Sequence, residues 1–344
     1  MPNILDVARR AGVSAMTVSR VVNGTGPVRG ETRRRVLAAM QELKYVPNSL
    51  ARSLVHQKTH MLAVIIPDIT NPFFTTLVRG VEDLARKSGY RVILCNSDED
   101  DDKEREYMEM CLSIRLDGAV IAPAGDQSAR NLALLDDYGI PFVLIDREIR
   151  GVQADTVIGD SVQTARKLAD HLIGLDHRTI ALITGSRATS TGRDRIEGYR
   201  QALLAADIPF DPALVKTTSW VKEWQEDVVG ELLDRSPRLT AILTANNFLA
   251  AQTMRALRQR GLDVPADISV VSFDDLHPLS AADPFLTAAV QPAYNFGSLA
   301  TQLLIERMEG GGRTHAPRRI TLQADIAVRR SAGRPRAPEE TAGS

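Results

Sequence analysis

The chain of 344 residues, 44% hydrophobic and 25% charged, is long enough for two or three globular domains of ordinary composition. It contains no run of about 20 apolar residues that would cross a membrane, and its first residues lack the charged leader and apolar stretch of a signal peptide. Its only cysteines, Cys95 and Cys111, lie within apolar patterns, so we expect reduced buried thiols, a cytoplasmic protein and no membrane partner.

The net charge of -1 hides an uneven distribution of charge along the chain. The first sixty residues carry ten Lys or Arg against three acids, a net +7, whereas the rest carries 32 basic and 40 acidic residues. A basic end on an otherwise acidic protein indicates a polyanionic partner for that end. A basic face that is only solvated would give the same counts, so charge alone leaves both interpretations open.

Residues 4–45 have the apolar spacing of three helices. The apolar positions are Ile4, Val7, Ala8 and Ala11 in the first helix, Val18, Val21 and Val22 in the second, and Val36, Leu37, Met40 and Leu43 in the third. Pro47 ends the third helix, and a short helical pattern follows from Asn48 to Leu54. We therefore predict a small all-α domain over 1–46 and a short helix with linker over 47–60.

The first two helices have the local sequence of a helix-turn-helix. Gly12 can adopt the positive φ of a tight turn, Val13 can bury in the corner, and Ser14 can cap the second helix. The buried valines of that helix leave a different set of side chains on its outer face, namely Ala15, Met16, Ser19, Arg20 and Asn23. A helix that enters the major groove of DNA needs such a free face.

The outer face of the second helix carries groups suited to double-stranded DNA. Arg20 can bond the edge of a guanine with two hydrogen bonds, and Ala15 and Met16 can contact thymine methyl groups. The short polar side chains suited to phosphates are Ser14, Thr17, Ser19 and Asn23. A plain helical hairpin with a solvated face is the alternative, and the basic charge of this end favours DNA binding.

From Met61 onward, short apolar runs alternate with amphipathic segments. The runs are MLAVIIP, RVILCN, GAVIAP, FVLID, IALIT, TAILT and ISVVSF. Such strands are typical of parallel sheets covered by helices on both faces. The pattern restarts near 155–160, so we predict a two-lobed α/β domain over 61–332 with a ligand cleft between the lobes. The composition of 333–344 predicts a disordered tail.

Polar and aromatic side chains stand where the predicted strands end, and ligands bind at such ends. The candidate cleft residues are Asn71, Phe73, Phe74, Asp146, Arg147, Arg195, Trp220, Asn246, Asp274 and Gln291. Each has an ordinary alternative: the two Phe beside Pro72 suit a core, Asn71 and Asn246 suit helix caps, and Asp146 or Arg195 suits a surface ion pair. Together they combine aromatic faces with groups that bond vicinal hydroxyls.

No set of residues indicates an enzyme. The sequence has no phosphate-binding loop, no nucleophile elbow and no metal-ligand spacing among its six histidines. His177, in GLDHRTIALITG, suits a loop or the start of a strand better than a ligand. We therefore predict no catalytic activity, cofactor or metal.

The run LDVARRAGVSAMTVSRVVNG, with ETRRRVLAAMQELKYVPNSLARSL after it, resembles the lactose-repressor family of bacterial transcription regulators. The similarity covers nearly the whole chain. It implies that the residues at Ala15, Met16 and Arg20 contact bases. Many members carry longer polar side chains at the first two positions, so hydrogen-bond readout here rests on Arg20. The family more often has a Ser cap and an acid where Arg29-Gly30 stands, so the third helix lacks a typical start.

The resemblance also identifies Asn48–Leu54 as a hinge helix. Seven residues are too few to stay helical alone, since isolated helices need roughly 12–15, so this segment would order only on DNA and against a second copy. Leu54 would then be an apolar wedge in a minor-groove base step, with Ser49 and Arg52 on the backbone. The alternative is that Leu50 and Leu54 pack on the large domain.

The candidate cleft residues resemble the pattern of sugar-responsive family members and of ribose-type periplasmic binding proteins, in which matching positions hold a pyranose. Trp220 replaces the usual Phe, and Asn247 replaces a common Asp. The resemblance implies a homodimeric repressor on double-stranded operator DNA, controlled by a monosaccharide, with a pentose such as ribose favoured over a hexose or sugar acid. A sugar-binding protein of a transport system and an α/β enzyme acting on a sugar are the alternatives.

Overall fold

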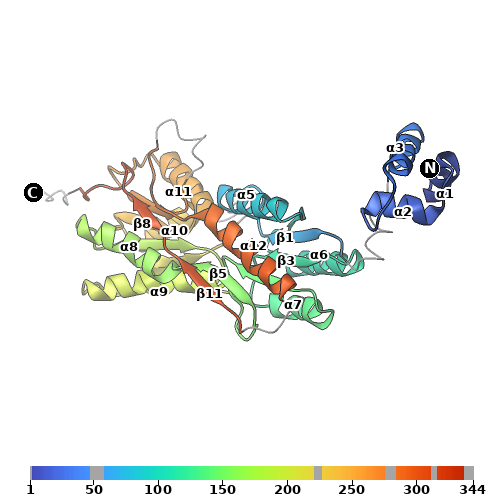
Figure 1. Cartoon of the computed structure of the whole chain (residues 1–344). Coiled ribbons are helices and arrows are strands. Elements are labelled where there is room, and N and C mark those ends of the chain that lie inside the picture. The colour runs from blue at the N-terminus through green and yellow to red at the C-terminus, as the bar shows by residue number, and fades with distance from the viewer. Residues whose placement is uncertain (1, 47–57, 221–226, 276–283, 311–315, 337–344) are drawn as a thin grey trace, which may run out of the picture. The chain divides into compact units, whose positions relative to one another are not determined.

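The computed structural model describes residues 2–46, 58–220, 227–275, 284–310 and 316–336 (Figure 1). The chain divides into two compact units, residues 1–59 and 60–344. Within the described ranges, none of the helices is both long enough and apolar enough to cross a lipid bilayer.

The smaller unit contains three helices, α1 (Ile4–Ala11), α2 (Ala15–Asn23) and α3 (Gly30–Glu42). Asn3 starts α1, because its side-chain oxygen accepts hydrogen bonds from the backbone N–H groups of Leu5 and Asp6 at 2.8 and 3.2 Å. The Asp6 carboxylate accepts in return from the Asn3 backbone N–H at 2.9 Å, which completes a capping box. The helix ends at Gly12, whose φ of 62° is the left-handed conformation predicted for the turn.

The three helices pack around a small apolar core. Its buried members are Val7, Ala8, Ala11, Val18, Val21, Val36 and Ala39. Arg35 on α3 donates to the backbone oxygen of Ala11 at 2.7 Å and so holds α3 against the end of α1. Leu37, expected on the buried side of α3, is 49% exposed, because it lies one residue, about 100° of helix rotation, beyond the buried Val36.

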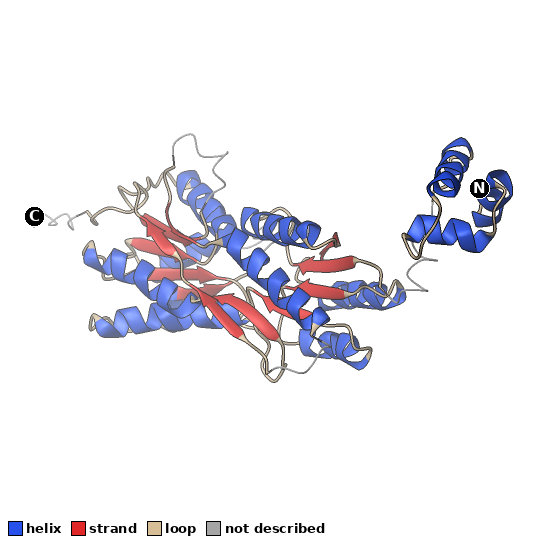
Figure 2. Cartoon of the chain, viewed as in Figure 1, coloured by secondary structure: helices blue, strands red, loops and turns tan. Residues whose placement is uncertain are grey.

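The larger unit consists of two α/β lobes, each built on a six-stranded sheet with helices on both faces (Figure 2). In lobe 1 all strands are parallel, in the order β11-β5-β4-β3-β1-β2, with α5 and α12 on one face and α6 and α7 on the other. The elements of lobe 1 are β1 (Met61–Ile66), α5 (Pro72–Lys87), β2 (Arg91–Asn96), α6 (Asp101–Ser113), β3 (Gly118–Ile121), α7 (Ser128–Asp137), β4 (Phe142–Ile145), β5 (Asp155–Gly159), α12 (Ala293–Glu309) and β11 (Arg319–Leu322).

Lobe 2 has the same layers, with α8 and α9 on one face of its sheet and α10 and α11 on the other. Its strand order is β12-β10-β9-β8-β6-β7, and the edge strand β12 is antiparallel to β10. The elements are α8 (Ser161–Gly174), β6 (Ile180–Thr184), α9 (Ser190–Ala205), the 3-10 turn η1 (Pro212–Leu214), β7 (Val215–Thr217), α10 (Val228–Arg235), β8 (Ala241–Thr244), α11 (Asn247–Gln259), β9 (Ser269–Phe273), β10 (Thr287–Val290) and β12 (Asp325–Ala327). The predicted parallel sheets are therefore confirmed.

The lobes are not two successive halves of the chain, as a restart near 155–160 implied. β5 is the fifth strand along the chain in lobe 1, and the second lobe begins only with α8. The chain then returns to lobe 1 to form α12 and β11, and passes back to lobe 2 for β12. Three chain segments therefore connect the two lobes, which limits how far they can separate.

Residues 333–336 differ from the disordered tail predicted there. His177 is buried, and its Nε2 lies 2.8 Å from the backbone oxygen of Gly333. Arg336 forms a 2.7 Å ion pair with Asp267. The composition of this segment indicated disorder, but the buried imidazole gives it a fixed partner in lobe 2. The rest of the predicted tail lies outside the described residues.

Candidate DNA-reading helix and effector pocket

Helix α2 begins at the predicted N-cap, and one of its faces is exposed. The Ser14 side-chain oxygen accepts from the backbone N–H of Thr17 at 3.2 Å, as expected for an N-cap. Val18 and Val21 are buried, whereas Met16 is 64% exposed and Arg20 is also exposed. The exposed pair lies four residues apart, on one side of the helix, where both side chains can approach the same nucleic-acid groove.

The other predicted DNA-contacting residues fall into two groups. Ser14 is exposed, and the half-buried members are Ala15, Thr17, Ser19 and Asn23. The Asn23 amide donates to the Ser19 hydroxyl at 3.1 Å, so these two polar groups are already oriented along the helix. Arg52, Leu54 and the rest of the expected hinge helix lie outside the described residues.

In the larger unit, nine of the ten predicted cleft residues line one pocket. The complete lining is Pro67, Asp68, Asn71, Phe73, Phe74, Glu99, Asp146, Arg147, Thr191, Arg195, Trp220, Asn246 and Asp274. The exception is Gln291, which lines a neighbouring pocket that shares Phe73 and Asp274, and which donates from Nε2 to Asp274 Oδ1 at 2.6 Å. Both lobes contribute, because the pocket lies at the carboxyl ends of their strands.

The first group of lining residues follows β1. Asn71 caps α5 by accepting from the backbone N–H of Phe73 at 3.0 Å, and Pro72 occupies the first turn as predicted. The rings of Phe73 and Phe74 pack edge to face with centroids 5.1 Å apart. Both rings also belong to the apolar core of lobe 1, so the core interpretation and the pocket interpretation hold for the same side chains.

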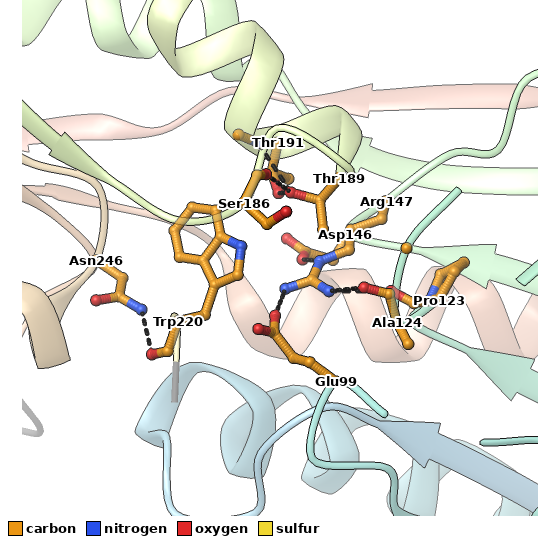
Figure 3. A network of polar contacts seen from close by, with 12 residues as sticks. Glu99, Pro123, Ala124, Asp146, Arg147, Ser186, Thr189, Thr191, Trp220 and Asn246 are labelled. Atoms are coloured by element: carbon orange, nitrogen blue, oxygen red, sulfur yellow. Dashed lines mark hydrogen bonds and ion pairs between the residues drawn. The ribbon is translucent and has the colours of Figure 1, made fainter. Parts of the chain in front are cut away.

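Asp146 and Arg147 follow β4, and both are buried, so the ion pair of 3.6 Å between Arg147 Nε and Asp146 Oδ2 is a buried pair and not a surface one. Arg147 Nη1 donates to the backbone oxygens of Pro123 and Ala124 at 3.0 and 3.2 Å (Figure 3). Its Nη2 donates to Glu99 Oε1 at 2.6 Å. Burial raises the pKa of Asp146, and the positive charges of the neighbouring arginines oppose that shift only in part.

Arg195 and Trp220 form the lobe 2 wall. The buried Arg195 guanidinium lies over the Phe273 ring at 4.0 Å and over the Trp220 ring at 5.2 Å, and it donates to the backbone oxygen of Ala245. The indole lies directly against Gly185, where a Cβ atom would overlap it. Trp220 Nε1 is buried and has no hydrogen-bond acceptor within the described part of the chain, so it is free to donate to a ligand.

Asn246 and Asp274 complete the polar wall. Asn246 accepts from the backbone N–H of Leu249 at 2.7 Å and so caps α11, which was its alternative interpretation, and it lines the pocket as well. Burial raises the pKa of Asp274 to about 6, although the Arg195 charge and the Gln291 hydrogen bond act in the opposite direction. A carboxylate with this pKa can accept hydrogen bonds from hydroxyl groups at neutral pH.

Four lining residues escaped the sequence prediction, namely Pro67, Asp68, Glu99 and Thr191. Asp68 and Glu99 stand just beyond β1 and β2, so the rule that ligands bind at the carboxyl ends of strands could have found both. Thr191 lies one helical turn before Arg195 on α9, so the two side chains share one face of the helix, and this spacing could have indicated that Thr191 lines the pocket. Glu99 was hidden in an acidic run that has the composition of a solvated surface.

Polar contacts join the two lobes beside the pocket. Arg193 on α9 binds Asp126 of lobe 1 through two hydrogen bonds of 2.7 and 3.1 Å. The backbone N–H of Asp126 also donates to the backbone oxygen of Ala188 at 3.0 Å. The Glu148 backbone N–H donates to the Ser190 hydroxyl at 3.1 Å. The two lobes are therefore in contact beside the pocket in this structure.

Two family models match the chain. The model of bacterial regulatory proteins, lacI family, matches residues 3–48. The model of periplasmic binding proteins and sugar binding domain of LacI family matches residues 59–327. These ranges correspond to the helical unit and to the two-lobed unit, and they confirm the predicted fold class.

Similar proteins support the same assignment. The HTH-type transcriptional regulator DegA of Bacillus subtilis is 35% identical over 95% of this chain and 97% of its own length. The ribose operon repressor of the same organism is 35% identical over 89% of this chain and 91% of its own. The crystal structure of the lac repressor dimer bound to operator and the anti-inducer ONPF has a TM-score of 0.81 and 27% identity, covering 96% of this chain and 99% of that one.

Proposed function

The chain belongs to the LacI family of bacterial regulatory proteins, and we propose that it is a homodimeric repressor whose affinity for operator DNA is controlled by a small sugar. As a member of this family it is a DNA-binding transcriptional regulator. The similarity to the lac repressor dimer on its operator supports the proposal that two copies bind a pseudo-palindromic site in the cytoplasm.

The pocket is the observation that carries the sugar proposal. Aromatic faces from Phe73, Phe74 and Trp220 suit the C–H face of a sugar ring, and buried Asp and Arg side chains suit its hydroxyl groups. The pocket is lined from both lobes by side chains that would surround one small ring, which favours a monosaccharide. Trp220 stands where sugar-responsive family members usually have Phe, and the larger indole leaves less room, so a pentose such as ribose is the leading candidate.

The effector would act through the lobes. A sugar that bonds both walls of the pocket binds the closed arrangement better than an open one, and this differential affinity is what shifts the equilibrium. In the proposed mechanism, lobe closure changes the spacing of the paired segments 48–54, which hold the two helix-turn-helix units on DNA. Met16 and Arg20 would read the bases, and the short polar side chains around them would contact phosphates.

A sugar-binding protein of a transport system is not favoured, because that function leaves the DNA-binding match over residues 3–48 without a role. The test is fluorescence anisotropy of the protein on its own upstream DNA, with and without D-ribose, D-xylose, D-glucose and D-glucuronate. We expect one sugar to change the DNA affinity at least tenfold, and the direction of the change identifies it as inducer or corepressor. If the DNA affinity were the same with every sugar, the proposed control would be wrong.

A further inference from the structure

The turn between β2 and α6 holds an unusual backbone. Asp98 and Glu99 have φ values of 54° and 56°, the left-handed region that side-chain-bearing residues seldom occupy. The Asp98 carboxylate fixes the turn, because it accepts from the Asn96 amide at 2.5 Å and pairs with Lys103 Nζ at 2.5 Å. Such strained conformations persist where the surroundings determine them, often beside ligand sites.

The result of this turn is that Glu99 reaches the pocket. Its Oε1 lies 2.6 Å from Nη2 of Arg147, whose side chain is 4% exposed (Figure 3). The other terminal nitrogen of Arg147 already donates to the backbone oxygens of Pro123 and Ala124. Both terminal nitrogens of the guanidinium are therefore bonded within the protein, and its positive charge is paired with Glu99 and, at 3.6 Å, with Asp146 before any ligand arrives.

Acidic residues outnumber basic residues in the lining of the pocket. The acidic lining residues are Asp68, Glu99, Asp146 and Asp274, and the basic ones are Arg147 and Arg195. An incoming anion would have to displace Glu99 from Arg147 or leave one of two negative groups buried without a partner, and an unpaired buried charge is costly. A neutral polyhydroxy compound meets no such penalty, because its hydroxyls donate to the carboxylates and accept from Arg195 and Trp220.

We propose that Glu99 is a specificity residue that makes this pocket select neutral polyhydroxy compounds over their carboxylate and phosphate counterparts by pairing with Arg147. The inference rests on the proposed sugar-binding function and narrows its ligand class. Placing like charges together at a binding site costs several kcal/mol, so the neutral compound should bind roughly a hundredfold more tightly than its anionic counterpart.

The test compares matched ligands by isothermal titration calorimetry on the full-length protein at constant ionic strength. The pairs are D-glucose with D-glucuronate, which exchanges a hydroxymethyl group for a carboxylate, and D-glucose with D-glucose 6-phosphate, which keeps the pyranose ring and adds a phosphate. Glu99→Gln keeps the shape and removes the charge, and Glu99→Asn removes the charge with a shorter side chain whose residue type tolerates positive φ. Glu109→Gln is the matched control, because it also removes one charge from this region but breaks only an exposed pair with Arg105 at 2.9 Å.

We expect the wild-type protein and the Glu109→Gln control to prefer the neutral member of a pair, and both Glu99 variants to reduce that preference at least tenfold. Equal binding of neutral and anionic ligands by the wild-type protein would overturn the proposal. A preference that stays within about threefold in both folded Glu99 variants would overturn it as well.

A second experiment uses inorganic phosphate as the anion and needs no sugar. It should raise the melting temperature of Glu99→Gln but not of the wild-type protein, and the additional change Arg147→Met should abolish the gain. If no sugar in the panel binds the wild-type protein, the proposed function fails, while this arm still decides whether Glu99 blocks anions. No phosphate effect in Glu99→Gln would refute the role of Glu99 by itself.

Discussion

The charge of Asp274 changes within the pH range of ordinary binding experiments, because burial raises its pKa to about 6. A sugar hydroxyl that donates to the ionised carboxylate stabilises the charged form. Effector affinity should therefore be highest above pH 6 and fall as the pH drops through that value, by at most about tenfold per pH unit. Calorimetric titration between pH 5 and 8 measures this profile.

Asp274→Asn should bind more weakly at pH 8 and lose most of the pH dependence. A smaller dependence can remain from Asp146, whose pKa burial also raises. The exposed Asp137 at the end of α7 gives a matched control, since Asp137→Asn should keep the wild-type profile. An affinity in the wild-type protein that stays level from pH 8 to pH 5 would mean that Asp274 does not accept a bond from the ligand.

Arg20 is the residue of α2 that we expect to determine most of the base specificity. It is exposed on α2 beside the apolar Met16, so it is the long hydrogen-bonding side chain of the predicted base-reading set. Arg20→Ala should cost about 1–3 kcal/mol of operator binding and relax specificity at one base pair. Gel shifts with operator variants measure both effects, and a uniform loss across all sequences would place Arg20 on phosphate instead.

Among the elements, α5 and α12 cross with their backbones in direct contact. A Cβ atom at Gly297 would overlap the backbone oxygen of Leu77, and one at Gly80 would overlap that of Tyr294. Gly297→Ala should therefore lower the free energy of unfolding by about 1–3 kcal/mol, although alanine favours a helix. Urea denaturation measures the change.

The control for this crossing is Gly174 at the end of α8, where an added Cβ would meet open space. Gly174→Ala should leave the free energy of unfolding unchanged or raise it by up to about 1 kcal/mol. Equal effects of the two substitutions would show that the close crossing contributes nothing measurable.

The elements also show what a sequence can and cannot predict. Local patterns located seven of the twelve described strands, because each of the seven is a short apolar run between turns, and they located the caps at Ser14, Asn71 and Asn246. The short or less apolar strands β5, β7, β10, β11 and β12 are not among these seven runs. The pairing of α12 with α5 depends on residues more than 200 positions apart, such as Leu77 and Gly297, and no local pattern records it. Strand ends predicted nine pocket residues, but Glu99 reaches the pocket only through two positive φ angles, which its sequence does not signal.

At the scale of the whole molecule, the ion pair between Asp126 and Arg193 joins lobe 1 to lobe 2. The pair is partly exposed, with side-chain exposures of 46% and 26%, so its contribution is expected to be about 0.2–1 kcal/mol. Arg193→Met should weaken effector binding by roughly two- to fivefold, because the contact between the lobes that ligand binding favours then lacks this ion pair.

A double-mutant cycle with Asp126→Asn isolates the contribution of the pair in the same calorimetric titration. Arg105 and Glu109, an exposed pair within α6, serve as the control cycle and should not affect ligand affinity. Effects of Arg193→Met and Asp126→Asn that simply add would mean that the pair does not assist closure.

The three connections between the lobes also determine the order in which the parts of the chain can fold during synthesis. The helical unit is complete once its first 59 residues have emerged, and at about 5–20 residues per second it can fold within seconds. The sheet of lobe 1 stays unfinished until β11 leaves the ribosome, and that of lobe 2 waits for β12 a few residues later. A nascent chain cut short before residue 319 would therefore carry a complete helical unit while the sheets of both lobes remain unfinished.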